Sequence, residues 1–155
     1  MRFDKLRMAL LASALFALAG CSEEHKALRA EDYRTVPVRF PNGKEIRAEQ
    51  MVNRQDMLNG MMFRDALPEG RGMLFYHGNE GQHAYWMYQV KVPLDLIWIS
   101  RTKKIVQIVH KAPPCPGPSN QCPSYGGAFP ASYVLEVPAG TAAANGLKPG
   151  MTLDF

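Results

Sequence analysis

Apolar and polar residues alternate near the start of the domain, and this pattern predicts a β-hairpin. The alternation runs through Val36–Phe40, whose apolar side chains fall on one face, and resumes at Ile46 and Ala48. Asn42-Gly43 lies between the two runs, and both of its residues tolerate positive φ. The sequence therefore predicts two antiparallel strands joined by a tight turn.

Two short helices are predicted from helical spacing and from capping residues. Asn53 can cap the first helix with Asp56 as its partner, and this helix should end near Arg64. Its apolar face would carry Met57, Leu58, Met61 and Met62. The second helix is a single turn over residues 141–145, capped by Thr141.

Short apolar or alternating runs predict the remaining strands. They cover residues 73–76, 84–88, 94–100, 104–111, 133–137 and 151–155. The stretch 112–130 is rich in Pro, Gly and Ser and is expected to be an irregular connection. The predicted strands and helices do not alternate along the chain, so βαβ units are not expected. The expected fold is mainly β (α+β): a single small antiparallel β-barrel-like domain with two short helices, over residues 36–155.

The first 20 residues are predicted to be an export signal. A short positive segment precedes an apolar run at residues 8–18, which is too short for a bilayer core of about 30 Å. The run ends in Leu18-Ala19-Gly20-Cys21, which resembles the box of bacterial lipoproteins, where the cysteine thiol carries diacylglycerol. The alternative is an ordinary signal peptide with a chance cysteine. Residues 21–35 are polar and are expected to be a flexible tether.

This reading implies a place in the cell and a partner. We expect the protein to be anchored in the lipid bilayer through Cys21, in the bacterial cell envelope. By resemblance to Gram-negative sorting, Ser22 favours the periplasmic side of the outer membrane. The formal charge of +4 falls to +2 once residues 1–20, with three basic residues and one acidic residue, are removed. No basic run occurs, so nucleic acid is not an expected partner.

Four blocks of sequence follow one another along residues 36–155. They are Gly60–Arg64 with 67–68 and 72–75, Trp86-Met87 with 92–95, 112–115 with 122–125, and 131–137 with 139–140, 146–147 and 150. In this order they resemble the domain-of-unknown-function 192 family. Where that family usually has Lys-Asn-Thr, this sequence has Tyr88-Gln89-Val90. The resemblance implies a small β-rich fold and secreted or lipoprotein members, and it implies no established reaction.

Cys115 and Cys122 are the even pair of cysteines that remains after Cys21. In an exported protein such a pair predicts a disulfide. The alternative is a pair of redox or metal-binding thiols. Redox catalysts usually place two cysteines closer together, at the start of a helix.

Three charged residues are candidates for catalysis. Asp95 lies between two leucines at the start of an apolar strand, and a buried carboxylate needs a partner, for which Arg64 is the natural choice. Glu136 is the third candidate. The same residues could equally form a structural ion pair that fixes the fold. The sequence contains no G-x-S-x-G, H-E-x-x-H or P-loop motif.

Aromatic residues suggest a binding face. Tyr85, Trp86 and Tyr88 lie on one strand, so Trp86 should point away from the two tyrosines. Tyr125, in the Pro-rich connection, could lie over that face. The alternative is plain packing in the core.

Soft metal ligands are also present, although we expect neither a metal nor a cofactor. Met57, Met61 and Met62 with His77 and His83 could bind copper, but methionine also fills gaps in cores. The leading hypothesis is a small binding or accessory module for an unknown small ligand or envelope protein. The alternative is an envelope hydrolase that uses Asp95, Arg64 and Glu136.

Overall fold

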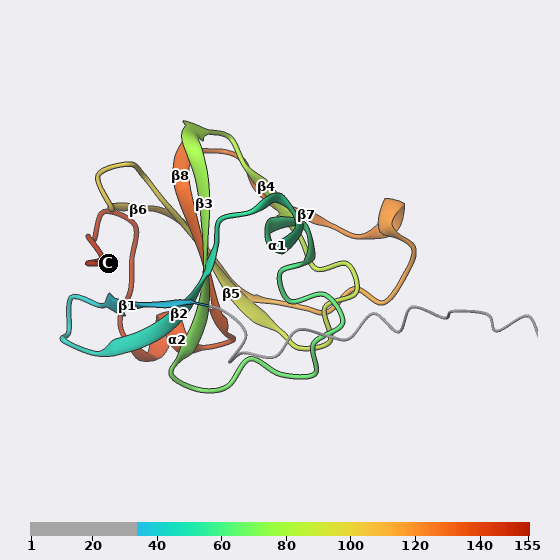
Figure 1. The fold of residues 1–155 in the computed structure, drawn as a ribbon, viewed down its shortest axis with the longest axis horizontal. Helices are drawn as coiled ribbons and strands as arrows, with labels where there is room; N and C mark the ends of the chain where they lie inside the picture. The colour runs from blue at the N-terminus through green and yellow to red at the C-terminus, as the bar shows by residue number, and fades with distance from the viewer. Residues whose placement is uncertain (1–33) are drawn as a thin grey trace, which may run out of the picture.

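The computed structural model describes residues 34–155, which form one large sheet and one small sheet (Figure 1). The large sheet has the order β1-β2-β3-β8-β5-β6. Its strands are β1 (Thr35–Arg39), β2 (Glu45–Met51), β3 (Arg71–Gly81), β5 (Leu94–Ile99), β6 (Ile105–Ala112) and β8 (Ala131–Pro138). The small sheet pairs β4 (Ala84–Trp86) with β7 (Ser124–Gly126). The helices are α1 (Arg54–Asn59), α2 (Thr141–Ala144) and the 3-10 turn η2 (Ser119–Gln121).

These elements confirm a mainly β fold with two short helices. The predicted signal, Cys21 and nearly all of the predicted tether lie outside the described residues. The last tether residue, Thr35, already belongs to β1, where it pairs with Glu49. None of the described helices has the length and apolarity of a membrane-spanning segment.

The predicted closure of the sheet into a barrel-like form is wrong. Within residues 34–155, β1 and β6 remain the edges of the large sheet. The C-terminal segment reaches both edges: Arg39 and Asp154 exchange backbone hydrogen bonds of 2.8 and 3.1 Å, and the N–H of Leu153 donates to the carbonyl of Lys103 at 3.0 Å. Because this segment divides its pairs between two edges, it forms isolated bridges and no continuous ladder.

β2 and β3 are parallel, although the sequence pattern predicted an antiparallel sheet. Their register runs from Arg47 opposite Arg71 to Met51 opposite Phe75. The connection over residues 52–70 contains α1, so this part of the chain is a βαβ unit. The other paired strands are antiparallel. The crossover brings α1 beside the later half of β3.

Alternating side chains divide the core between the two faces of the large sheet. The α2 face buries Val38, Ile46, Leu74, Ile97, Leu135 and Val137, together with Ala142 and Leu147. The opposite face, called here the cavity face, buries Met51, Met61, Met73, Phe75, Leu96, Trp98 and Val134. Every residue of β5 is buried, because both faces of that strand are covered.

The helix ends show how local sequence and tertiary contacts combine. Asn53 caps α1 as predicted, since its Oδ1 accepts from the N–H of Asp56 at 2.9 Å. The helix ends at Gly60, earlier than predicted: a Cβ there would lie 3.1 Å from the Phe75 ring, and φ is +44°. The predicted Thr141 cap on α2 is wrong: the N-cap is Gly140, and Thr141 is the first residue of the helix.

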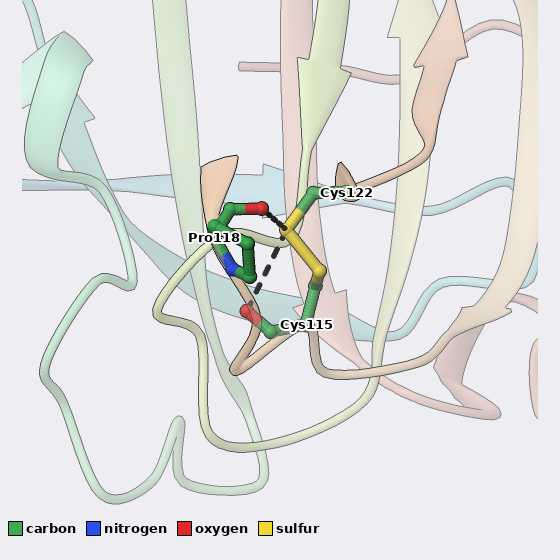
Figure 2. The surroundings of a disulfide bond; sticks show 3 residues. All are labelled: Cys115, Pro118 and Cys122. Atoms are coloured by element: carbon green, nitrogen blue, oxygen red, sulfur yellow. Dashed lines mark hydrogen bonds between the residues drawn. A yellow bond between two sulfur atoms is a disulfide. The ribbon is translucent and has the colours of Figure 1, made fainter. Parts of the chain in front are cut away.

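The Cys115–Cys122 disulfide is present, as predicted (Figure 2). Its Cα atoms are 5.8 Å apart. The bond closes the loop that carries η2, and the Cys122 Sγ lies 3.7 Å from the Cys115 carbonyl oxygen. The supposedly irregular stretch 112–130 therefore holds ordered structure, including β7, which the sequence did not predict.

Candidate functional site

A cavity of about 730 Å³ opens between α1, the later half of β3, and β4. We call it the α1 cavity. Its apolar and aromatic walls include Met57, Met61, Met62, Phe75, Tyr85 and Trp86. Its polar lining includes Arg54, Asn59, His77 and Glu136. A largely apolar concavity with a few convergent polar groups is the usual form of a small-molecule site.

Strand alternation explains why these side chains meet. Phe75 and His77 are two residues apart on β3 and so share one face. Glu136 on β8 is opposite Met73 on one side and Leu96 on the other. These neighbours belong to the cavity face, which places Glu136 there.

Glu136 is the most unusual group in the α1 cavity. It is 5% exposed, and its Oε2 has no hydrogen-bond partner among the described residues. A Cβ on Gly60 would lie 3.9 Å from this oxygen, so the carboxyl group faces the end of α1. Burial raises the pKa of Glu136 to about 8, although the Arg64 guanidinium acts to lower it. At neutral pH the group is therefore mainly an uncharged acid that can donate and accept.

A buried ionic cluster lies in the same row of the sheet. Glu49 is fully buried and opposite Met73, the residue that also pairs with Glu136. Arg64 Nη1 donates to its Oε2 at 2.9 Å, and Arg71 Nη2 lies 3.6 Å from its Oε1. Burial raises the pKa of Glu49, while both arginines oppose that shift. The cluster gives Arg64 a buried carboxylate partner.

Neither Glu49 nor Arg71 was predicted from the sequence to be a functional residue. Glu49 follows Ala48 directly, so alternation places it on the other side of the strand from Ile46 and Ala48. That face is covered by the βαβ crossover, which carries Arg64. Glu49 lies within β2 and Arg71 begins β3, so the parallel pairing of these two strands is what brings the residues close together.

Asp95 lies on the other face of the sheet. It is fully buried; Oδ1 accepts from the N–H of Lys111 and Oδ2 from the N–H of Ala142, both at 2.8 Å. Asp95 is opposite Val137, one position away from the pair of Leu96 with Glu136. The three predicted catalytic candidates are therefore not brought together: Arg64 and Glu136 lie on the cavity face, and Asp95 caps α2 from the α2 face.

The aromatic candidates are also divided. Tyr85 and Trp86 line the α1 cavity, and Trp86 is 46% exposed. Tyr125 is opposite Tyr85 in the small sheet and packs against the core. The ring of Tyr88 lies 5.3 Å from that of Trp86, so its predicted orientation away from Trp86 is wrong. β4 ends at Trp86, and the strand alternation therefore does not extend to Tyr88.

His77 and Tyr85 form a polar pair in the cavity wall. His77 Nε2 lies 3.0 Å from the Tyr85 hydroxyl, and the His83 ring stacks on His77 with centroids 3.5 Å apart. Burial and the neighbouring His83 lower the pKa of His77 to about 4, so it is uncharged at neutral pH. Burial and the charge of Glu136 raise the pKa of Tyr85.

The residues of the copper hypothesis lie partly together. Met57, Met61, Met62 and His77 line the α1 cavity. The His83 ring is stacked against His77, and its Nε2 lies 3.3 Å from the carbonyl oxygen of Asn79. Across residues 34–155, no three His, Cys, Asp or Glu side chains are grouped as metal ligands would be.

Comparisons with known proteins agree with this fold. The family model described as DUF192, Uncharacterized ACR, matches residues 38–155. A crystal structure from Sinorhizobium meliloti 1021, described as a "putative transcription regulator", is 28% identical, with a TM-score of 0.70 over 79% of this chain and 94% of that one. A protein of unknown function from Novosphingobium aromaticivorans DSM 12444 is 27% identical, with a TM-score of 0.72 over 83% and 90%. No curated protein matches the chain.

Proposed function

Because the chain belongs to the domain-of-unknown-function 192 family, whose description assigns no activity, we propose a function from the α1 cavity itself. The protein is a binding module for a small ligand that has an apolar body and one hydrogen-bonding end. The observation that carries this proposal is the buried carboxyl of Glu136, a residue of the cavity wall, whose Oε2 has no hydrogen-bond partner among the described residues.

The energetics of the site favour such a ligand. A volume of about 730 Å³ lies within the range of about 300–1,000 Å³ that ligand pockets occupy. Leaving a buried polar atom without a hydrogen bond costs about 1–3 kcal/mol. A ligand group that bonds to Glu136 would recover that free energy, while its apolar body would cover the exposed Trp86 and the partly buried Met57 and Met62.

Filling the mouth of the cavity should abolish binding. Ala84 is exposed and lines the cavity, so Ala84→Phe would place a ring in its opening. Ala143→Phe is the matched control, because Ala143 is exposed on α2. We expect Nile red, a neutral apolar dye, to fluoresce with wild type and with Ala143→Phe, and at least tenfold less with Ala84→Phe. Equal fluorescence with both variants would contradict the proposal.

One observation favours a second candidate function, that of an acid–base enzyme. The α1 cavity gathers three groups with shifted pKa values, namely His77, Tyr85 and Glu136, and such gathering is typical of active sites. Glu136 would donate a proton, and Arg64 would stabilise the charge left on it. No serine, threonine or cysteine is found among the described residues that line the cavity. Hydrolysis of chromogenic esters or amides that disappears in Glu136→Gln would support the enzyme.

We also propose that the domain is exported and lipid-anchored in the bacterial envelope, on the periplasmic side of the outer membrane. The order of charged segment, apolar run and cysteine supports this, as does the Cys115–Cys122 disulfide, since disulfides persist in oxidising compartments. The description of the Sinorhizobium protein would suggest nucleic acid as a partner. The lack of a basic run in the sequence gives that suggestion no support.

Lipidation should depend on Cys21. Wild type expressed in a Gram-negative host should yield an N-terminal peptide that begins at Cys21 and carries the mass of several acyl chains. Cys21→Ser should lack that mass, and its processing should be blocked or altered, because the thiol that carries the lipid is absent. Ser22→Ala keeps the box and should remain acylated. Mass spectrometry of an unmodified wild-type peptide would refute the anchor.

A further inference from the structure

We propose that the ligand of the α1 cavity is an apolar amine, whose ammonium group pairs with the carboxylate of Glu136. This inference deepens the proposed function and rests on it. It specifies the charge of the ligand's polar end, which the shape of the cavity leaves open.

The polar group at the cavity wall is an acid. Glu136 is the one carboxylate among the described residues that line the cavity. Its Oε2 is buried and has no partner among those residues. An ionised carboxylate accepts hydrogen bonds and donates none, so a charged N–H donor completes it best.

Aromatic residues form much of the wall around Glu136 in the α1 cavity. Phe75, Tyr85 and Trp86 line the cavity, whereas the ring of Tyr76 packs on the α2 face. Aromatic ring faces attract cations, and this attraction strengthens when the site excludes water. Trp86 keeps almost half of its surface exposed at the mouth, where it can cover an entering ligand. Aromatic walls around a single acid favour an organic cation over an anion.

The positive groups near Glu136 already have a carboxylate partner or are exposed or uncharged. Arg64 is the cation that acts on Glu136, but it already donates to the buried Glu49 at 2.9 Å. Arg71 Nη2 also lies 3.6 Å from Oε1 of Glu49. His77 is uncharged at neutral pH. Arg54 is exposed at the rim, where solvent and salt weaken its field. Glu49 therefore offsets part of the positive charge of the two arginines near Glu136.

Binding of an amine should release a proton. Burial raises the pKa of Glu136 to about 8, so the free protein holds a proton there at pH 7. An alkylammonium group, like that of lysine, keeps its proton up to about pH 10. Forming the ion pair therefore expels the proton of Glu136 to solvent. The affinity should rise by up to about tenfold per pH unit below pH 8 and level off above it.

Three compounds with one apolar body provide the test: 4-phenylbutylamine, 4-phenylbutanol and 4-phenylbutyrate. Binding to the full chain is followed by Trp fluorescence and by calorimetry in two buffers of different ionisation enthalpy. We expect the amine to bind at least tenfold more tightly than the alcohol at pH 8, and to release nearly one proton at pH 7. Glu136→Gln should bind the amine no better than the alcohol, and the proton release should vanish.

The outcomes separate this inference from the proposed function. If the alcohol or the carboxylate binds as tightly as the amine, the inference is overturned and the binding function stands. An amine that binds tightly without proton release, or equally well to Glu136→Gln, also overturns it. If none of the three compounds and no Nile red binds wild type, the binding function fails as well.

Discussion

Asp95→Ala should destabilise the domain by about 3–5 kcal/mol, because the buried carboxylate accepts from two backbone N–H groups, one buried and one partly buried. Hydrogen bonds to a charged group contribute about 1.5–3 kcal/mol each, and here both donors would be stranded. The lost contacts join β5 to β6 and to the first turn of α2. Such a loss is a large fraction of the roughly 5–15 kcal/mol that stabilise a typical domain. Urea unfolding of purified wild type and variant would measure it.

Two further variants make this result interpretable. Asp95→Asn keeps one acceptor oxygen but turns an amide N–H toward a backbone donor, so an intermediate loss is expected. Asp65→Ala removes an exposed carboxylate that pairs with Lys91, and a change within about 0.5 kcal/mol is expected. If Asp95→Ala were as stable as wild type, the structural role would be wrong and a functional role for Asp95 would return.

Glu136→Gln should become more stable than wild type as the pH rises. The pKa of Glu136 is about 8 in the folded protein, against 4.5 for an unburied glutamate. Between these values the folded state holds a proton that the unfolded state has lost, so wild-type stability falls as pH rises from about 4.5 to about 8. At 1.36 kcal/mol per pKa unit, the full effect is roughly 3–5 kcal/mol. Above pH 8 the difference in stability between Glu136→Gln and wild type stays constant.

The measurement is the difference between the two unfolding free energies from pH 4 to pH 9. Taking the difference matters because other groups titrate: the lowered pKa of His77 makes stability rise with pH between about 4 and 6.5, which is the opposite direction. Glu49 contributes in the same direction as Glu136. Both contributions are common to the two proteins and cancel. Parallel curves would show that Glu136 is not buried as an uncharged acid.

Much of the fold followed from local patterns, and the exceptions share a cause. The hairpin around Asn42-Gly43, the cap at Asn53 and most strands depend on neighbouring residues, so the sequence predicted them. The parallel pairing of β2 and β3, the open sheet and the β4–β7 pair depend on contacts between distant segments. Alternation alone does not specify which strand becomes a neighbour.

The candidate site shows the same limit. Period-two alternation shows that Glu49 differs in direction from Ile46, but it does not show whether that face is covered. For Asp95 the sequence correctly indicated burial, yet the register places it on the face opposite Glu136. Tyr85, Trp86, Arg64 and Glu136 were named from sequence, and their proximity required the fold.

The position of β8 has a consequence for how the chain is made. β8 lies between β3 and β5, near the centre of the large sheet (Figure 1). It is the last long strand in the sequence, so a ribosome must synthesise most of the chain before the two halves of the sheet can join. Pairing of such distant segments is slow. A chain that completes its core this late should remain incompletely folded while it emerges, which would suit the export proposed above.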